Sequence, residues 1–224
     1  MELELKKECL DTYELGEPQT LTQEETAETI VPDYCPDIAR IISAEGVVCL
    51  HGGTEQDGVT GTVRVTVLYT PENESGVRAL EFAMPFSAQG EGLAGCAHVV
   101  VETEIELLES RMLNPRKIFT RCKLVTHLAG CRKVCLTISS DAETDPALLV
   151  EKRCCGQTVS LLRQVAEKDL TFSETMSLSL GREGAAELLH CRANGIVTET
   201  KAIGNKLIFK GVFLVSALYL SLIH

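Results

Sequence analysis

The chain contains an internal repeat, and this repeat constrains the fold more than any other feature. Residues 61–69 recur as residues 211–219, an offset of 211 − 61 = 150, and both copies read Gly-x-apolar-x-Val-x-apolar-Leu-Tyr. An apolar set further upstream repeats with an offset of 185 − 38 = 147: Ile38, Ile41 and Ile42 return as Ala185, Leu188 and Leu189. Small loop insertions produce such a drift, so we infer that one domain has been duplicated.

The repeat also sets the expected domain boundaries. A period of this length is the size of one domain, so residues 1–140 are expected to form the first copy. Residues 141–146 are polar and are expected to be a linker. Residues 147–219 then supply only the N-terminal half of a second copy. The match stops at Tyr219, and we expect residues 220–224 to be a non-native tail on a C-terminally truncated protein.

Composition argues against several classes of function. The chain has 224 residues, of which 45% are hydrophobic, and this favours a folded protein. A net charge of −11 repels phosphate groups, so nucleic acid and anionic membranes are not expected as partners. Aromatic residues make up 4% with no Trp, which argues against a sugar-binding surface. With no apolar run of transmembrane length and no signal-like N-terminus, a cytoplasmic location is expected.

Ten cysteines invite a metal or redox interpretation, but their spacing does not favour one. Cys131 and Cys135 lie in an alternating, strand-like segment, where about 13 Å separates residues four apart. Two thiolates at that distance cannot share a zinc ion. Cys154 and Cys155 are adjacent and face opposite sides of a strand. We therefore expect small, buried, reduced thiols, with a cysteine-dependent enzyme as the remaining alternative.

Alternating polarity predicts a mainly β protein, a β-rich α+β fold with an antiparallel sandwich or barrel-like architecture. Each copy is expected to open with an extended arm, over residues 3–31 with a break at 16–18 and over residues 148–178. Further strands are expected over residues 98–107, 118–124 and 134–138, with a turn at residues 113–115.

One short helix is expected after the first arm. Pro36 and Asp37 suit a first helical turn, and Ile38, Ile41 and Ile42 have the spacing of one helical stripe. Gly46 is placed to end the helix, and Gly195 is its expected counterpart in the second copy.

A hairpin is expected to follow the helix in each copy. Residues 47–50 lead through a polar turn at 52–58 into the strand at 61–69. The alternate residues of this strand and of its counterpart are apolar in the same register, so the same face is expected to be buried in both copies: Val63, Val65, Val67 and Tyr69, and then Phe213, Val215, Ala217 and Tyr219.

No catalytic, cofactor-binding or metal-binding residue is expected. The five histidines, His51, His98, His127, His190 and His224, do not repeat between the copies. Asp33 and Asp37 resemble a paired acid site, but turn and capping roles are favoured. Residues 90–95 are glycine-rich, yet Glu91 lies where a phosphate would approach. Residues 114–117 are basic and are assigned to a turn, with a partner-binding patch as the alternative.

Four segments together carry a family resemblance: residues 31–42, reading Val-Pro-Asp-Tyr-Cys-Pro-Asp-Ile-Ala-Arg-Ile-Ile; residues 46–48, reading Gly-Val-Val; residues 61–69, closing on Val-Leu-Tyr; and residues 113–118, reading Leu-Asn-Pro-Arg-Lys-Ile. They resemble the SPOCS domain of the sporulation family that includes SipL. The resemblance covers most of residues 1–140, and a weaker match covers residues 147–219.

The resemblance implies a non-catalytic, protein-interaction scaffold in spore coat and envelope assembly, at the forespore surface in the mother-cell cytosol. It implies spore-envelope proteins as partners, among them the coat-basement ATPase that family members engage through a LysM module, which this sequence lacks. A peptidoglycan-binding protein is the alternative. An incomplete second copy would also expose an unpaired edge, so self-association is expected.

Overall fold

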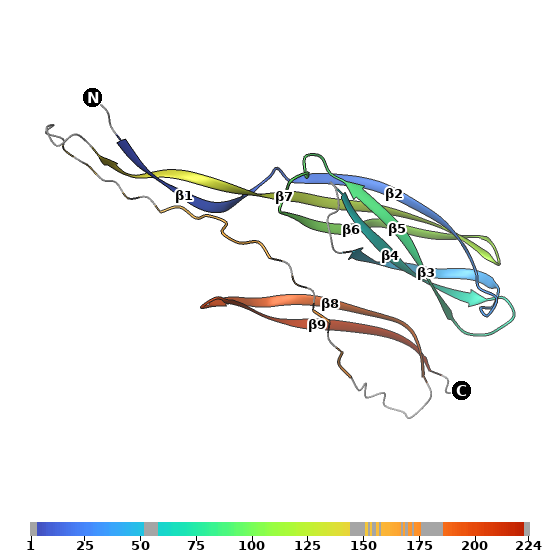
Figure 1. Ribbon diagram of the computed structural model, residues 1–224. Coiled ribbons are helices and arrows are strands. Elements are labelled where there is room, and N and C mark those ends of the chain that lie inside the picture. The colour runs from blue at the N-terminus through green and yellow to red at the C-terminus, as the bar shows by residue number, and fades with distance from the viewer. Residues whose placement is uncertain are drawn as a thin grey trace.

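The computed structural model describes residues 4–51, 58–143 and 186–221, together with residues 151, 153, 156, 158–166, 168, 170, 171 and 173–175. These residues form an all-antiparallel β structure without a helix (Figure 1). The strands are β1 (Glu4–Leu15), β2 (Gln19–Ile30), β3 (Ile38–His51), β4 (Gly58–Pro71), β5 (Arg78–Gln89), β6 (His98–Asn114), β7 (Lys117–Glu143), β8 (Ala186–Ile203) and β9 (Lys206–Ser221). The mainly β prediction is confirmed.

Strand β7 pairs with each of the other strands of the larger sheet. Its first half lies between β2 and β6, and its second half pairs with β1. Strands β1 and β2 follow one another along the same edge of β7, as Figure 1 shows, because Leu15 pairs with Cys131 and Gln19 with Leu128. The break predicted at residues 16–18 is the point where the chain passes from one strand to the next. Strand β7 runs to Glu143 and so includes the first residues of the expected linker.

A second sheet of β3, β4 and β5 packs face to face on the β2–β7–β6 part of the first, so the first copy is a sandwich. Strand β4 lies at its centre and pairs with both neighbours. Its inward residues Val63, Val65, Val67 and Tyr69 are at most 1% exposed, as their alternation predicted. Residues of both sheets meet them in one core: Ile38, Leu80, Met84, Phe86, Ile118, Cys122 and Leu124.

The prediction of a short helix over residues 36–46 is wrong, because this segment enters strand β3 at Ile38. Two β-bulges interrupt the pairing of β3 with β4, one between Ile38 and Arg40 and one between Ile41 and Ser43. Each bulge inserts one residue, so inward side chains here lie three apart rather than two. Ile38 and Ile41 thus share a face as they would in a helix, although branched side chains favour a strand.

The β8–β9 hairpin reproduces the pairing of β3 with β4, as the repeat predicted. Leu188 pairs with Tyr219, at the positions that correspond to Ile41 and Tyr69. A register shift follows at once in both hairpins, in the second between Leu188 and His190. The duplicated sequence therefore carries not only the strands but also the bulge.

The glycine equivalence drawn from the sequence is not kept by this register. Gly46 pairs with Val65, and the corresponding pair in the second hairpin is Ala193 with Val215. Gly195 lies two residues further along β8 and pairs with Phe213. The assignment of Gly46 and Gly195 as helix-ending residues fails with the helix itself.

Burial of the same face in both copies is also wrong. In β9, Phe213 is 59% exposed and Tyr219 is 43% exposed, whereas the corresponding Val63 and Tyr69 of β4 are fully buried. The reason is that, among the described residues, β9 lacks the neighbouring strand and the facing sheet that bury β4. Strand β4 has β5 beside it and the larger sheet across its face, whereas β9, within the described residues, pairs only with β8.

The second extended arm is not a strand in its described residues. Between residues 151 and 175 they form only one isolated bridge, between Leu162 and Tyr13 of β1. The Leu162 carbonyl accepts hydrogen bonds from the Tyr13 backbone N–H at 2.7 Å and from the Thr12 hydroxyl at 2.9 Å. A strand needs a continuous ladder partner, and one bridge does not supply it. No helix among the described residues is long and apolar enough to cross a membrane.

Candidate functional site

Two loops that are far apart in the sequence meet at one end of the sandwich. Residues 31–37 connect β2 to β3, and residues 115–116 form the tight turn between β6 and β7. The Val31 N–H donates to the Arg116 carbonyl and the Ile38 N–H to the Pro115 carbonyl, both at 2.9 Å. The turn is therefore bonded to Val31, the first residue of the loop, and to Ile38, the first residue of β3. Loop and turn lie in two of the segments that carry the family resemblance.

Arg116 holds the loop by its guanidinium group. One terminal nitrogen donates to the Cys35 carbonyl at 2.8 Å and to the Asp37 carboxylate at 3.1 Å. The other donates to the Val31 carbonyl at 2.8 Å and to the Asp33 carboxylate at 3.0 Å. The planar fork of arginine suits such divided contacts, and lysine could not reproduce them. We name Arg116 with residues 31–37 the arginine clamp.

The clamp explains the two candidate acids. Asp33 and Asp37 are brought together, but through the positive charge of Arg116 rather than as a pair that shares a proton. The Cys35 N–H donates to the Pro32 carbonyl at 2.9 Å, which closes a turn around Asp33. The turn role predicted for this segment is therefore seen, whereas the helix-capping role is not. Residues 114–117 form the expected turn, and the Asn114 side chain accepts from the Arg116 N–H at 2.9 Å.

The clamp contains one tyrosine, Tyr34, and is contacted by a second, Tyr69 of β4. Tyr34 is 87% exposed at the tip of the loop, whereas Tyr69 of β4 is fully buried beneath it. The Tyr69 hydroxyl donates to the Pro36 carbonyl at 3.4 Å. Burial, and next the nearby Cys35, raise the pKa of Tyr69 to about 12. The clamp thus rests on an un-ionised phenol and presents a second aromatic ring to the outside on an anchored backbone. Rings presented in this way are common contact residues in protein interfaces.

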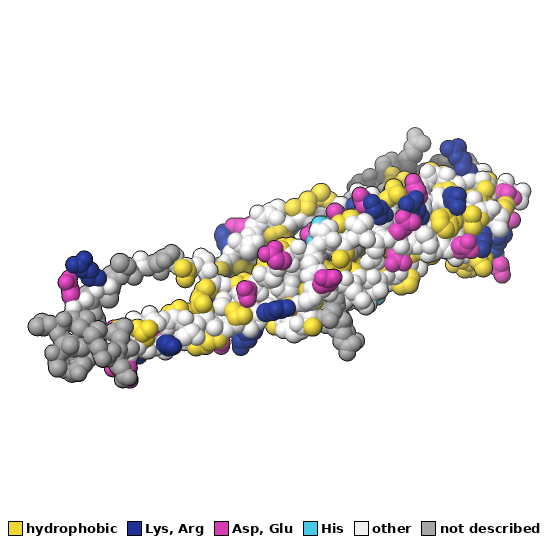
Figure 2. Space-filling model, turned by 90° about the horizontal axis from the view of Figure 1, so that it is seen from above, with side chains coloured by type: hydrophobic (Ala, Val, Ile, Leu, Met, Phe, Trp, Pro, Cys, Tyr) yellow, Lys and Arg dark blue, Asp and Glu magenta, His cyan; other side chains and the backbone are white. Residues whose placement is uncertain are grey.

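The outer face of the larger sheet is a mixed-charge surface. Cross-strand ion pairs join Arg121 to Glu24 at 2.7 Å and Lys123 to Glu106 at 2.8 Å, and Lys117 pairs with Glu28. Figure 2 shows the same alternation of basic and acidic side chains at the right-hand end of the molecule. Balanced surface charge of this kind keeps a sheet solvated and gives no single-sign field for an anionic ligand.

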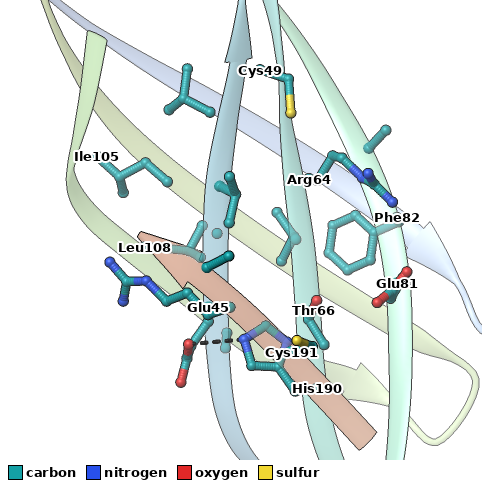
Figure 3. Close-up of a pocket in the computed structure, with 18 of the residues that line it drawn as sticks. Glu45, Cys49, Arg64, Thr66, Glu81, Phe82, Ile105, Leu108, His190 and Cys191 are labelled. Atoms are coloured by element: carbon teal, nitrogen blue, oxygen red, sulfur yellow. Dashed lines mark ion pairs between the residues drawn. The ribbon is translucent and has the colours of Figure 1, made fainter. Parts of the chain in front are cut away.

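A groove of about 970 Å³ lies where β8 crosses the outer face of the β3–β4–β5 sheet (Figure 3). His190 of β8 places its Nε2 atom 3.2 Å from the Glu45 carboxylate of β3, although not in hydrogen-bond geometry. Cys191 of β8 and Arg64 of β4 also line the groove. The mixture of both charges with apolar side chains suits a polypeptide better than a small anion.

The other histidines lie in separate places. His51 contacts the Thr62 hydroxyl at 2.7 Å and His127 the Thr20 hydroxyl at 3.0 Å, each across a strand pair. The ring of His98 packs against Tyr13 with centroids 6.0 Å apart. His224 lies outside the described residues. In the described parts of the chain, no three His, Cys, Asp or Glu side chains gather as they would around a metal ion.

The cysteines correct one expectation. Cys9 of β1 and Cys135 of β7 form a disulfide, with Cα atoms 5.8 Å apart. The prediction that all cysteines are reduced is therefore wrong for this pair. Cys131 is buried as a free thiol, as is Cys122, whose pKa is raised to about 11 by burial and next by Glu25. The adjacent Cys154 and Cys155 lie outside the described residues.

The glycine-rich segment at residues 90–95 is a surface loop. Side chains of the sheet hold it in place through hydrogen bonds to its backbone. Arg132 donates to the Gly92 carbonyl at 2.6 Å, and Gln19 makes two hydrogen bonds with the Glu91 backbone. Gly92 has φ of +65°, in the region that favours glycine. The glycines therefore serve the path of the chain.

Sequence reasoning missed the link between Arg116 and the acidic loop, and it expected one face of β9 to be buried, where Phe213 and Tyr219 are exposed. The link joins residues 79 to 85 positions apart, which no local pattern records. A signal was present nonetheless, because an arginine in a turn and two acids four residues apart in a proline-rich loop have complementary charges.

Comparisons with protein-family models, with curated proteins and with solved structures gave no match for this chain.

Proposed function

We propose that this protein is a non-catalytic interaction scaffold in the assembly of the endospore envelope and coat, acting at the forespore surface. The proposal starts from the resemblance to SPOCS-domain proteins carried by residues 31–42 and 113–118. One observation supports it most: Arg116 joins these two segments into one clamp, from which Tyr34 projects. Residues that form one structural unit and present an exposed aromatic ring suit a surface for protein contact.

The kinds of exposed surface agree with this proposal. The described chain offers the clamp, a groove between the two copies and a hairpin with apolar side chains on its surface. Surfaces of this kind favour contacts with other polypeptides. Spore-envelope proteins are the proposed partners, and the mother-cell cytosol is the proposed location.

Localisation in a sporulating cell tests the proposal. The chain would be produced as a fluorescent fusion in an endospore-forming bacterium, and the expected result is a shell of fluorescence around the forespore. A Tyr34→Ala fusion is expected to weaken the shell, whereas Leu170→Ala, which alters another strongly exposed side chain, is expected to leave it intact. Fluorescence spread evenly through the mother cell at every stage would contradict the proposal.

A further inference from the structure

Strands β1 and β7 form a two-stranded ribbon that extends beyond the sandwich (Figure 1). The pairing of β7 with β2 ends at Leu128 and its pairing with β6 ends at Cys131, whereas its pairing with β1 continues to Glu143. We name residues 4–15 and 132–143 the ribbon. Two-stranded sheets are only marginally stable in water, so the ribbon needs a further source of stability.

The side chains of the ribbon are exposed rather than packed in a core. Leu5, Leu10 and Leu136 are each at least 37% exposed, whereas the inward residues of the first half of β7 are at most 1% exposed. Asp11 and Lys133 approach each other across the ladder at 3.8 Å, but both are mostly exposed, and such pairs contribute little. Burial therefore holds β2 on β7 but does much less to hold β1 there.

One disulfide joins the two strands of the ribbon. In the ladder, Cys135 lies opposite Asp11, two residues beyond Cys9. The Cys9–Cys135 bond therefore runs diagonally between neighbouring residue pairs on one face. It connects residues 126 positions apart, and a cross-link over so long a loop strongly restricts the opened chain. The disulfide is thus the constraint that most strongly keeps β1 on β7.

The disulfide is open to solvent. Cys9 and Cys135 are both exposed, whereas the free thiols of Cys122 and Cys131 are buried. Exchange of a disulfide begins when a thiolate attacks one of its sulfur atoms, and this requires access to the bond. A dissolved dithiol or a protein dithiol can therefore reach this bond while the core of the sandwich stays folded.

Strand β1 also holds part of the chain that connects the two copies. The Leu162 carbonyl accepts hydrogen bonds from the Thr12 hydroxyl and the Tyr13 backbone N–H. These two donors lie three and four residues from Cys9 on the same strand. If β1 leaves β7, both donors move with it. The state of the disulfide therefore also determines whether the contact with Leu162 is fixed relative to the sandwich.

We propose that the Cys9–Cys135 disulfide is a redox switch that holds or releases β1. In the release step, a thiolate of a dithiol reductant attacks one of the two sulfur atoms, the S–S bond breaks, and the other cysteine leaves as a thiolate that takes up a proton. The second thiol of the reductant then attacks the mixed disulfide and frees the first cysteine. Two electrons and two protons pass to the protein, and the reductant becomes a disulfide. The proposal rests on the ribbon alone, and so it does not depend on the spore-envelope role.

Hydrogen–deuterium exchange of the full chain, measured by mass spectrometry, tests the switch. The oxidised chain is compared with the same chain kept in dithiothreitol. The amides of residues 4–15 are expected to exchange several-fold faster in dithiothreitol, because the cross-link no longer limits opening of the ribbon. The amides of β4, at the centre of its sheet, are expected to keep their rates. Reoxidation with oxidised glutathione is expected to restore slow exchange in residues 4–15.

The double variant Cys9→Ser with Cys135→Ser separates this bond from other effects of the reductant. It is expected to exchange like the reduced parent chain, both with and without dithiothreitol. Cys191→Ser removes another exposed cysteine and is the matched control. This control is expected to respond to dithiothreitol as the parent chain does.

Three results would overturn the proposal. The first is equal exchange of residues 4–15 in the oxidised and reduced chains. The second is a loss of protection in β4 on reduction, because the bond would then support the whole fold rather than one strand. The third is a double variant that still responds to dithiothreitol in residues 4–15, because a different bond would then be responsible.

Discussion

Arg116 makes more long-range hydrogen bonds than any other charged side chain described above. Its guanidinium group meets two carbonyls and two carboxylates of a loop 79 to 85 residues away. Removing a charged donor from acceptors in a partly buried site costs more stability than breaking a solvated ion pair. The loop between β2 and β3 therefore depends on one side chain.

Replacing Arg116 by alanine is expected to lower the free energy of unfolding by about 2 kcal/mol, because four acceptors lose a charged donor. Arg116→Lys keeps the charge but not the fork, and we expect it to recover only part of the loss. Urea denaturation measures both. Arg121→Ala removes a single exposed ion pair with Glu24 and is the matched control, with a much smaller effect expected. Equal effects of Arg116→Ala and Arg121→Ala would contradict the clamp.

Tyr69 is expected to make the fold sensitive to high pH. Its pKa is about 12 in the folded protein against 10.0 ordinarily, so the folded state holds its proton more tightly than the unfolded state. The corresponding stability is complete below pH 10 and is lost as the pH rises toward 12, by about 2–3 kcal/mol. Unfolding in urea at a series of pH values measures this loss.

The conservative variant Tyr69→Phe isolates the tyrosine contribution. It is expected to lose less stability between pH 10 and 12 than the parent chain. Cys122, with a pKa raised from 9.0 to about 11, acts in the same direction and remains in the variant. Identical pH profiles of the two chains would show that Tyr69 does not ionise with the transition.

Strand positions were predictable where side chains alternate with period two. Strands β4 and β6 lie where alternation placed them, and the two strands expected over residues 118–124 and 134–138 are parts of the single strand β7. Strands β1 and β2 lie within the extended arm expected over residues 3–31, and the turn at Asn114 lies where it was expected. Strand β3 was mistaken for a helix because its two bulges convert a period of two into one of three. Bulges depend on the partner strand, so the sequence of one strand does not reveal them. What the sequence did carry was the repeat, which brings the bulge back in β8.

Gly61 is expected to be intolerant of any side chain, because β4 and β5 meet there. A Cβ atom would lie 2.4 Å from the buried Phe86 ring, so Gly61→Ala forces the ring to move, at a cost of about 1–3 kcal/mol. Thermal unfolding measures the loss. Gly156→Ala, where no atom lies within 4 Å of the added carbon, is the control. Combining Gly61→Ala with Phe86→Leu is expected to cost less than the sum of the two single changes.

At the scale of the molecule, the strands of the two copies share one alternating pattern but differ in whether another sheet packs against them. Periodicity identified which residues of β9 share a face, but it does not say whether another sheet lies against that face. The long-range contact between the loop at residues 31–37 and Arg116 was hidden for the same reason. Patterns along the chain record faces and turns, whereas the packing of one face on another depends on residues far away.

The exposed hairpin is expected to make the chain self-associate as its concentration rises. Phe209, Phe213 and Leu214 are each at least 57% exposed, and contact between molecules removes such surface from water. Light scattering over a concentration series measures the association. A variant with Phe213→Ser and Leu214→Ser is expected to associate less. Leu170→Ser, at an exposed site outside the hairpin, is the control and is expected to associate like the parent chain. A parent chain that stays monomeric at every concentration would contradict this expectation.

The long strand β7 also determines how the molecule would carry a mechanical load. Because β1 runs antiparallel to it, Glu4 lies opposite Glu143, and the start of β1 and the end of β7 leave the sheet together. A force applied between these two points breaks the hydrogen bonds between β1 and β7 one after another. It does not load all of them at once, as a shearing force would. The Cys9–Cys135 disulfide crosses the same ladder, so the opening would stop there and the sandwich beyond it would bear no tension.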